Sequence, residues 1–212
     1  MKNKTEYGHA PQLIGTFPID VEEMMFYQYL PIKMRYEHEW VIPKRLKIFQ
    51  PLIDQVIMNE FLIDKYVYIT AKNIYVTPDN MGNRPGWHSD GFGTDDINYI
   101  WCNNYPTEFC IQPFILSDDH SLSLIEMEEQ INTANIISYT RYQLLRLTES
   151  NIHRCTSINE GGMRAFVKIS ISKDRYNLIG NSHNHDMRYK WKMYAREVVR
   201  NHPQRKESDF IK

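Results

Sequence analysis

The chain has 212 residues, of which 42% are hydrophobic and 24% charged, and its formal net charge at pH 7 is −1. This length suits one domain with a sizeable core, and the near-neutral charge disfavours non-specific binding of the whole chain to polyanions. No run reaches the roughly 18 apolar residues that a transmembrane helix needs, and residues 1–12 lack the apolar core of a secretory signal.

Residues 1–64 are expected to form a helical and irregular segment that covers the rest of a single domain. The first forty residues show no periodicity and predict only one helical turn, near Val21–Tyr29. Pro43–Asp64 is the best helix candidate, because its apolar residues recur at helical spacing. Pro51 should limit the start of this helix, since proline is tolerated only in the first turn.

Residues 65–180 have the pattern of a β core. Lys65–Pro78 holds two β-branched and aromatic runs around Ala71–Asn73 and predicts a hairpin or two short strands. Ser121–Asn135 is acidic and is either a helix or an excursion between strands. The further strand candidates are 96–104, 108–116, 141–150, 151–157 and 163–173. Many short strands after one N-terminal helix predict a mostly β fold, a sandwich or a barrel.

Residues 181–212 form a basic C-terminal segment with two interpretations. Between Arg188 and Lys206, seven Lys and Arg residues alternate with aromatic residues, a combination that can bind phosphates and stack on bases. Alternatively, the segment is an amphipathic helix that packs Trp191, Met193 and Val198 on the β core. The near-neutral charge of the whole chain favours the second interpretation.

Cysteine usage predicts a reducing environment, with the cytoplasm as the expected location. Cys102, Cys110 and Cys155 are odd in number and lack the CxxC spacing of many zinc sites. A disulfide framework or a structural zinc site is therefore not expected.

The Gly-rich motif Gly86–Gly93 carries the candidate metal ligands. In an extended segment, residues i and i+2 point to the same side, so His88 and Asp90 would present an imidazole and a carboxylate to one point. His153 is far enough along the chain to return there on another strand. Two histidines and one carboxylate leave positions open on a metal ion, as in the facial triad of non-haem Fe(II) oxygenases. The alternative is a surface histidine beside an aspartate that caps a turn.

Arg164 lies in a strand candidate with clear alternation. Residues 164, 166, 168 and 170 share one face, and residues 165, 167, 169 and 171 share the other. The second face is aliphatic and can be buried, whereas the first would line a barrel mouth. A guanidinium there can bind a carboxylate through two parallel hydrogen bonds. A solvent-facing arginine is the simpler alternative for this residue taken alone.

The order and spacing of His88-Ser89-Asp90, His153 and Arg164 resemble the H-x-D…H-x₁₀-R signature of the Fe(II)/2-oxoglutarate-dependent dioxygenases. The resemblance covers about Tyr75–Ser172. It implies a double-stranded β-helix, or jelly roll, in which His88, Asp90 and His153 hold Fe(II) at one open end. It also implies that Arg164 pairs with the distal carboxylate of 2-oxoglutarate.

By the same resemblance, the protein would be a hydroxylase that uses O₂ and releases succinate and CO₂. Some branches of the family carry Ser where this chain has Phe166, so a second anchor for 2-oxoglutarate must come from elsewhere. The candidates are Tyr75, Tyr99, Tyr139 and Ser170.

Two other functions use the same residues differently. A zinc or manganese hydrolase would need the triad but neither Arg164 nor a keto acid. A non-catalytic jelly-roll binding module would need no metal. His183 and His185 form a rival metal pair, but their polar surroundings favour a loop.

The substrate is open among a small metabolite, a nucleotide or nucleic-acid base, and a protein side chain, and we favour a small molecule. An aromatic wall near the metal is one interpretation of five residues that core packing explains equally well: Trp87, Phe92, Tyr99, Trp101 and Tyr105.

Overall fold

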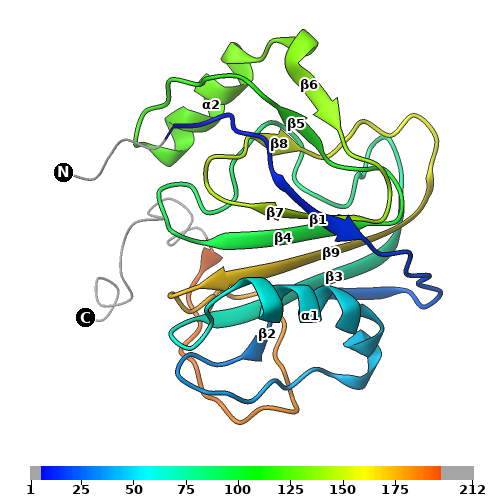
Figure 1. Cartoon of the computed structure of the whole chain (residues 1–212), viewed down its shortest axis with the longest axis vertical. Helices are drawn as coiled ribbons and strands as arrows, with labels where there is room; N and C mark the ends of the chain where they lie inside the picture. Colours follow the sequence, from blue (N-terminus) through cyan, green and yellow to red (C-terminus); the bar gives the residue numbers. More distant parts are fainter. Residues whose placement is uncertain (1–5, 197–212) are drawn as a thin grey trace.

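The computed structural model describes residues 6–196, which form mostly antiparallel β structure with few helices. A six-stranded sheet has the order β1-β7-β4-β9-β3-β2, and a three-stranded sheet has the order β6-β5-β8. The large sheet contains β1 (Gln12–Thr16), β2 (Met25–Lys33), β3 (Tyr66–Val76), β4 (Ile97–Cys102), β7 (Gln143–Leu147) and β9 (Gly162–Ser172). The small sheet contains β5 (Glu108–Cys110), β6 (Ile136–Ser138) and β8 (His153–Arg154). The two sheets lie one above the other in Figure 1.

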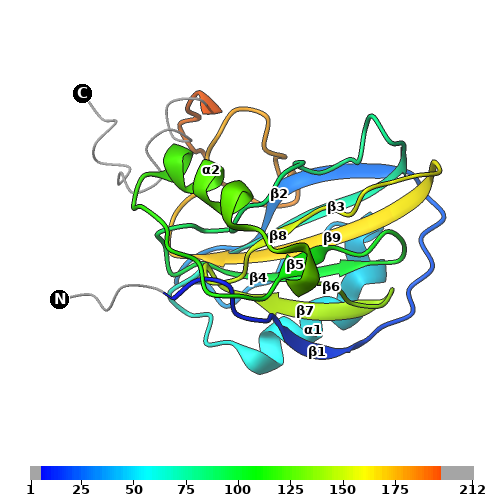
Figure 2. The same ribbon diagram turned by 90° about the horizontal axis from the view of Figure 1, so that it is seen from above.

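Four short helices complete the described fold: η1 (Lys44–Phe49), α1 (Gln50–Asn59), α2 (His120–Gln130) and η2 (Thr133–Asn135). Figure 2 shows α2 and the small sheet on the near side of the large sheet and α1 on the far side. No helix among residues 6–196 is long and apolar enough to cross a bilayer.

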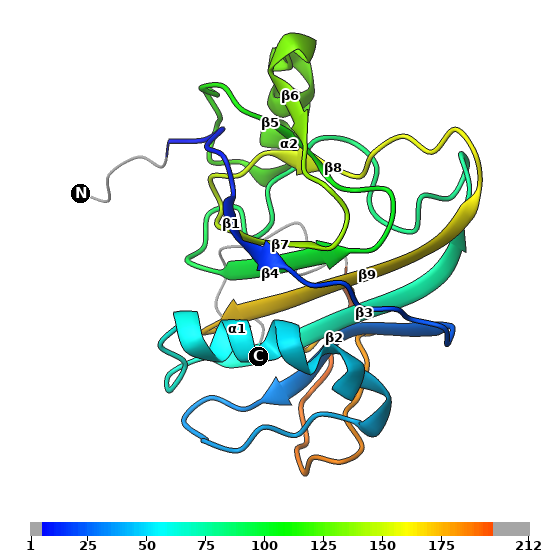
Figure 3. The ribbon, with the colours of Figure 1, turned by 45° about the vertical axis from the view of Figure 1, so that its right-hand side comes forward.

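The centre of the fold is the pair of eleven-residue strands β3 and β9, which match from Tyr66↔Ser172 to Val76↔Gly162. Side chains alternate between the faces of such strands, so every second residue points to the same face. On one face, Val167 and Ile169 are buried in the same hydrophobic core as Leu52 and Val56 of α1. Figure 3 shows α1 lying along this face. The predicted aliphatic face of residues 163–172 is therefore confirmed.

Helix α1 confirms the helix expected within Pro43–Asp64, although it is shorter than that range. Pro51 lies in its first turn, where the missing N–H costs no intrahelical hydrogen bond. The preceding residues form the 3₁₀ helix η1 instead. Helix α2 likewise resolves the acidic stretch Ser121–Asn135 as a helix for most of its length; the Asp119 side chain caps it by accepting from two backbone N–H groups.

The N-terminal prediction was wrong in one respect, because residues 1–64 supply two strands of the large sheet. Strand β2 covers most of the expected helical turn at Val21–Tyr29, and α1 follows β1 and β2 in the chain. Two register shifts and a proline inside β2 hide the alternation by which a strand is recognised. Strand β1 also has a register shift, so both edge strands of the large sheet are irregular.

Lys65–Pro78 was expected to break around Ala71–Asn73, but it forms the single strand β3. The two polar residues in the middle are accommodated by hydrogen bonds. The Asn73 side chain donates to the carbonyls of Val21 and Glu23, and Lys72 donates to the Gly82 carbonyl at 2.9 Å. These contacts offset the low strand propensity of both residues.

The described part of the C-terminal segment packs on β3 without forming the expected helix over 187–195. The Trp191 ring meets the Tyr66 ring edge-on, with their centroids 5.8 Å apart. Trp191 therefore packs on the fold as predicted, but Met193 is exposed, contrary to the prediction. Val198 lies outside the described residues. The three cysteines are free and buried.

Candidate metal centre

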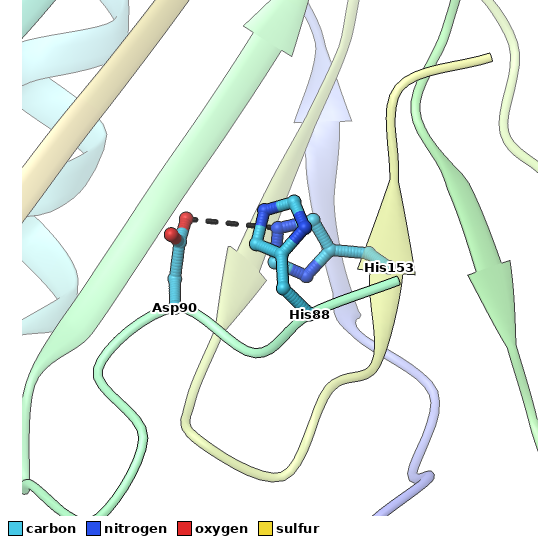
Figure 4. Close-up of side chains that lie close together, drawn as sticks. All are labelled: His88, Asp90 and His153. Atoms are coloured by element: carbon cyan, nitrogen blue, oxygen red, sulfur yellow. Dashed lines mark ion pairs between the residues drawn. The ribbon is translucent and has the colours of Figure 1, made fainter. Parts of the chain in front are cut away.

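The two candidate imidazoles come together because His88 and His153 face each other across a β-bridge. Each residue donates its backbone N–H to the carbonyl of the other at 2.9 Å. Directly opposed residues of an antiparallel pair project their side chains to the same face. The ring centroids are accordingly 4.5 Å apart (Figure 4). The bridge also places the His88 segment beside β8 of the small sheet.

Both imidazoles are held with one nitrogen free to bind a metal. The Nδ1 atom of His88 lies 2.9 Å from the Gly86 carbonyl, and that of His153 lies 3.0 Å from the Asn151 carbonyl. Because a carbonyl only accepts, these contacts favour protonated Nδ1 atoms and leave the Nε2 lone pairs available. Burial and the adjacent His153 lower the pKa of His88 to about 3. The His88 ring is thus neutral, the form that binds metal ions.

Asp90 completes the group from the start of a turn. Gly91, the next residue, has a φ of +73°, which lets the chain reverse directly after the carboxylate. One ligand atom from each of Asp90, His88 and His153 lies within 4.8 Å of the other two. The Asp90 Oδ2 atom is 3.6 Å from the His153 Nε2 atom (Figure 4). Among residues 6–196, these three form the group of His, Cys, Asp or Glu residues with metal-binding geometry.

Lys168 of β9, in the large sheet, forms an ion pair with the Asp90 carboxylate. Its Nζ atom is 3.0 Å from Asp90 Oδ2 and 3.1 Å from the Tyr29 hydroxyl. Burial by itself would raise the pKa of Asp90, but Lys168 and the two imidazoles outweigh it and hold that pKa well below its usual range. The carboxylate is therefore ionised at neutral pH, as a metal ligand must be.

All three candidate ligands line one cavity of about 820 Å³ between the two sheets. Lys72, Phe166 and Lys168 reach this cavity from the large sheet. They belong to the face of β3 and β9 that points away from α1. Of the four residues predicted to line a mouth, 166 and 168 line this cavity, whereas 164 and 170 do not. The candidate metal centre is thus open to a space large enough for organic ligands.

Arg164 is buried on the same face of β9 but is not among the residues that line the cavity. Its Nε atom donates to the Tyr105 carbonyl at 3.1 Å, and its guanidinium lies over the Phe166 ring. Its Nη2 atom is buried and has no hydrogen-bond partner among the described residues. A buried guanidinium nitrogen without a partner is costly, so this atom marks a place where an acceptor would be stabilising.

Lys72 is a cavity residue to which the sequence analysis gave no role. Burial, and then the positive charges of Lys168 and Arg164, lower its pKa to about 8. Of these three cations, Lys168 alone forms an ion pair in the described structure, and its partner is Asp90. Cation repulsion of this kind favours an anion at the cavity wall. The register Lys72↔Phe166 brings Lys72 here, and that pairing cannot be read from either strand alone.

The expected second anchors for a cosubstrate lie elsewhere. Tyr99 is on the α1 face, where its hydroxyl donates to Glu60 at 2.8 Å. Ser170 donates to Asn98, and the Tyr139 hydroxyl donates to the Pro11 carbonyl. Tyr75 is exposed. None of the four lines the cavity, so Lys72 and Lys168 replace them as candidates.

Most of the five residues considered for an aromatic wall near the metal do not line the cavity. Tyr99 and Trp101 belong to the core under α1, and Trp87 and Phe92 belong to a second core cluster, from which Phe92 also lines the cavity. The Tyr105 hydroxyl donates to the Glu160 carbonyl at 2.8 Å. Aromatic side chains suit a cavity wall and a core equally well, so the residue types alone could not decide between the two interpretations.

His183 and His185 do not belong to a group of three metal ligands in the described structure. Their rings lie 4.8 Å apart, and the His183 ring also contacts Tyr189. The loop interpretation agrees with this arrangement.

No model of a known protein family matches the sequence, and no curated protein matches it. Among solved structures, the crystal structure of EvdO2 from Micromonospora carbonacea var. aurantiaca is similar to this chain, with 14% sequence identity and a TM-score of 0.36. The match covers 62% of this chain and 66% of EvdO2, so the chain spans slightly under two thirds of that protein. A TM-score below 0.5 does not establish a shared fold, and the metal centre rests on its own geometry.

Proposed function

We propose that this protein is an Fe(II)- and 2-oxoglutarate-dependent oxygenase of the jelly-roll class, with His88, Asp90 and His153 as its iron ligands. The observation that carries the proposal is the pair of imidazoles of His88 and His153 beside the ionised carboxylate of Asp90, all three facing one large cavity. Two histidines and one carboxylate suit non-haem iron because they leave positions for O₂ and a chelating cosubstrate.

The cations beside the triad suit 2-oxoglutarate, which is a dicarboxylate. We assign its distal carboxylate to Arg164, whose guanidinium lies behind the cavity wall over the ring of Phe166 and whose buried Nη2 atom has no partner in the described structure. Binding there requires the carboxylate to reach past Phe166. Lys72 and Lys168 are the further cations available to the same molecule, because both line the cavity. The residues present therefore fit the cosubstrate in charge and in donor type.

When bound, Fe(II) and 2-oxoglutarate supply the oxidising power with which O₂ hydroxylates a C–H bond, and succinate and CO₂ are released. The protein contributes binding and orientation. The Gly86 and Asn151 carbonyls fix the two imidazole rings, and Lys168 fixes the Asp90 carboxylate. Such outer contacts around metal ligands commonly change metal affinity or activity by about 10- to 100-fold when they are removed.

The test is succinate formation against 2-oxoglutarate concentration for the wild type, Arg164→Ala and Arg164→Lys, with iron occupancy measured in parallel. Loss of a charge-assisted pair costs about 2–5 kcal/mol, so Arg164→Ala should weaken the apparent cosubstrate affinity by roughly 30-fold or more. Arg164→Lys should recover part of the loss, because an ammonium cannot form the forked contact. Iron binding should be unchanged in both variants.

Arg141→Ala is the matched control, because Arg141 is an exposed arginine outside the cavity. If all four proteins share one apparent affinity, Arg164 has no cosubstrate role. Iron-loaded wild type that forms no succinate would contradict the oxygenase proposal itself. Activity with zinc and without 2-oxoglutarate would instead favour the hydrolase.

A further inference from the structure

The cavity extends well beyond the triad, and this outer part is the subject of the inference. From Asp90, the contacts run through Lys168 to Tyr29, and the Tyr29 ring meets the Tyr176 ring edge-on at 5.1 Å. Beyond these rings, the lining continues along the segment 173–178 and reaches Arg35 at the end of β2. The total of about 820 Å³ lies high in the range of about 300–1,000 Å³ found for small-molecule sites. The outer part therefore has room for a second molecule beside a cosubstrate.

The charge of the cavity wall is opposite to the charge of the whole chain. In the described part of the chain, seven lining residues are Lys or Arg and three are Asp, although the full sequence has a formal net charge of −1. One of the three aspartates is the candidate metal ligand Asp90. Cations gathered in a concave wall focus a positive potential on whatever enters.

Arg35 is a cation of the outer part with an unsatisfied N–H group. Its Nη1 atom donates to the Lys173 carbonyl at 3.4 Å, and its guanidinium lies over the Tyr36 ring. Its Nε atom is buried without a hydrogen-bond partner, and Arg35 has no ion pair among residues 6–196. An arginine in a cavity wall with a buried, unsatisfied N–H lacks an acceptor, and an oxyanion would supply one.

Tyr29 stands between the triad and the outer part because β2 bulges there. The register of β2 against β3 shifts between Tyr27 and Leu30, and Tyr29 has a φ of +48°, which is unfavourable for a residue with a side chain. The Tyr29 N–H is satisfied by the Thr70 hydroxyl at 3.0 Å. Bulges beside sites often redirect a side chain, and this one turns the Tyr29 ring into the cavity.

We infer that the substrate is an organic oxyanion whose carboxylate or phosphate group binds Arg35, while its remaining part lies along Tyr29 and Tyr176 toward the triad. This inference rests on the proposed oxygenase function and names the substrate class for it. The tyrosine rings offer apolar faces with polar tips, which suits an organic body attached to a charged group.

The test uses zinc-loaded protein, in which no turnover occurs, and isothermal titration with phenyl phosphate, benzoate and benzyl alcohol. The titrations are run with and without saturating 2-oxoglutarate, which occupies the cations near the triad. At least one anion should bind at least tenfold more tightly than the neutral benzyl alcohol, and the tighter of the two names the charged group. Arg35→Gln should weaken that binding roughly tenfold, and Arg35→Lys should weaken it less.

Arg141→Gln removes the same charge from an exposed position outside the cavity and should behave as the wild type. The inference is overturned if neither anion binds, if benzyl alcohol binds as tightly, if 2-oxoglutarate abolishes the binding, or if Arg35→Gln matches Arg141→Gln. If an anion binds in a way that depends on Arg35 but the iron-loaded protein forms no succinate, the anion site is supported and the oxygenase function is contradicted. If succinate forms but no such binding is found, the oxygenase function is supported and the anion site is contradicted.

Discussion

The two faces of the large sheet are built from the same strands but differ in nearly every property. On the α1 face, Ile69 of β3 and Ile169 of β9 lie directly opposite each other in a core of aliphatic and aromatic side chains. On the cavity face, the neighbouring pair is Thr70, the residue after Ile69, and Lys168, the residue before Ile169. Because side chains alternate between the two faces of a strand, a core residue and a cavity residue are direct neighbours in the sequence.

This difference predicts that substitutions on the two faces have different effects: those on the α1 face lower stability, and those on the cavity face weaken ligand binding. Burial of apolar surface on the α1 face contributes to the free energy of unfolding. The cavity face instead holds cations and the candidate metal ligand Asp90, whose charges are costly to bury. Side chains on that face should affect ligand binding more than stability, and some should stabilise the fold when they are replaced.

The largest effect is expected at the three candidate metal ligands. Replacing His88, Asp90 or His153 by Ala removes one of three ligands and should reduce metal affinity by more than about 100-fold, beyond the loss seen when only an outer contact is removed. Turnover should be abolished. The measurement is anaerobic titration with Fe(II), checked with Mn(II), for each variant.

The double variant His183→Ala/His185→Ala is the control for these substitutions, because its histidines lie outside the candidate triad. It should bind iron as the wild type does. Iron lost in the double variant but retained in His88→Ala would show that the wrong residues have been chosen.

On the α1 face, Ile169→Ala should lower the free energy of unfolding by about 2–5 kcal/mol, because it leaves a cavity in a closely packed core. Metal affinity of the folded protein should stay unchanged, since the side chain points away from the triad. Urea unfolding and metal titration of the same samples test both expectations. A large loss of metal affinity in folded Ile169→Ala would contradict the separation of the two faces.

The smallest effect concerns Lys72, whose pKa is lowered to about 8 by burial and by nearby cations. A lysine with a lowered pKa binds its proton more weakly in the folded than in the unfolded chain. It therefore destabilises the fold at neutral pH, and this penalty fades as the pH rises from about 8 toward the usual lysine pKa. Lys72→Met should gain stability relative to the wild type at pH 7, and the difference should narrow by about 1 kcal/mol at pH 9.5.

Urea unfolding at the two pH values measures this change, and Lys190→Met, which alters an exposed lysine, serves as the control. A difference between wild type and Lys72→Met that is the same at both pH values would show that Lys72 carries no such penalty.

The fold could be predicted from the sequence where the patterns were local. Residues 163–172 alternate without interruption, and β9 has the expected faces. Pro51 correctly marked the first turn of α1. Strand β2 was missed because its bulges and its proline erase the alternation, and β3 was split because Lys72 and Asn73 suggested a turn. Both errors arose where hydrogen bonds from distant residues override local propensity.

The candidate site, too, could be predicted from the sequence only in part. The spacing His88-x-Asp90 and a distant histidine were sufficient to name the three residues that the structure brings together. Lys72, Tyr29 and Arg35 could not be assigned to the cavity, because their positions depend on strand register, on a bulge and on a strand end. No spacing along the chain encodes those relations.

The irregular edge strands of the large sheet have a consequence for self-association. A regular edge strand exposes a row of unpaired N–H and C=O groups that can recruit a strand from another molecule. Here β1 shifts register between Leu13 and Gly15, and β2 shifts twice and contains Pro31. Each interruption shortens the stretch to which a foreign strand could add. The bulge that turns Tyr29 into the cavity thus also limits edge-to-edge aggregation, although β2 carries the exposed apolar side chain of Phe26.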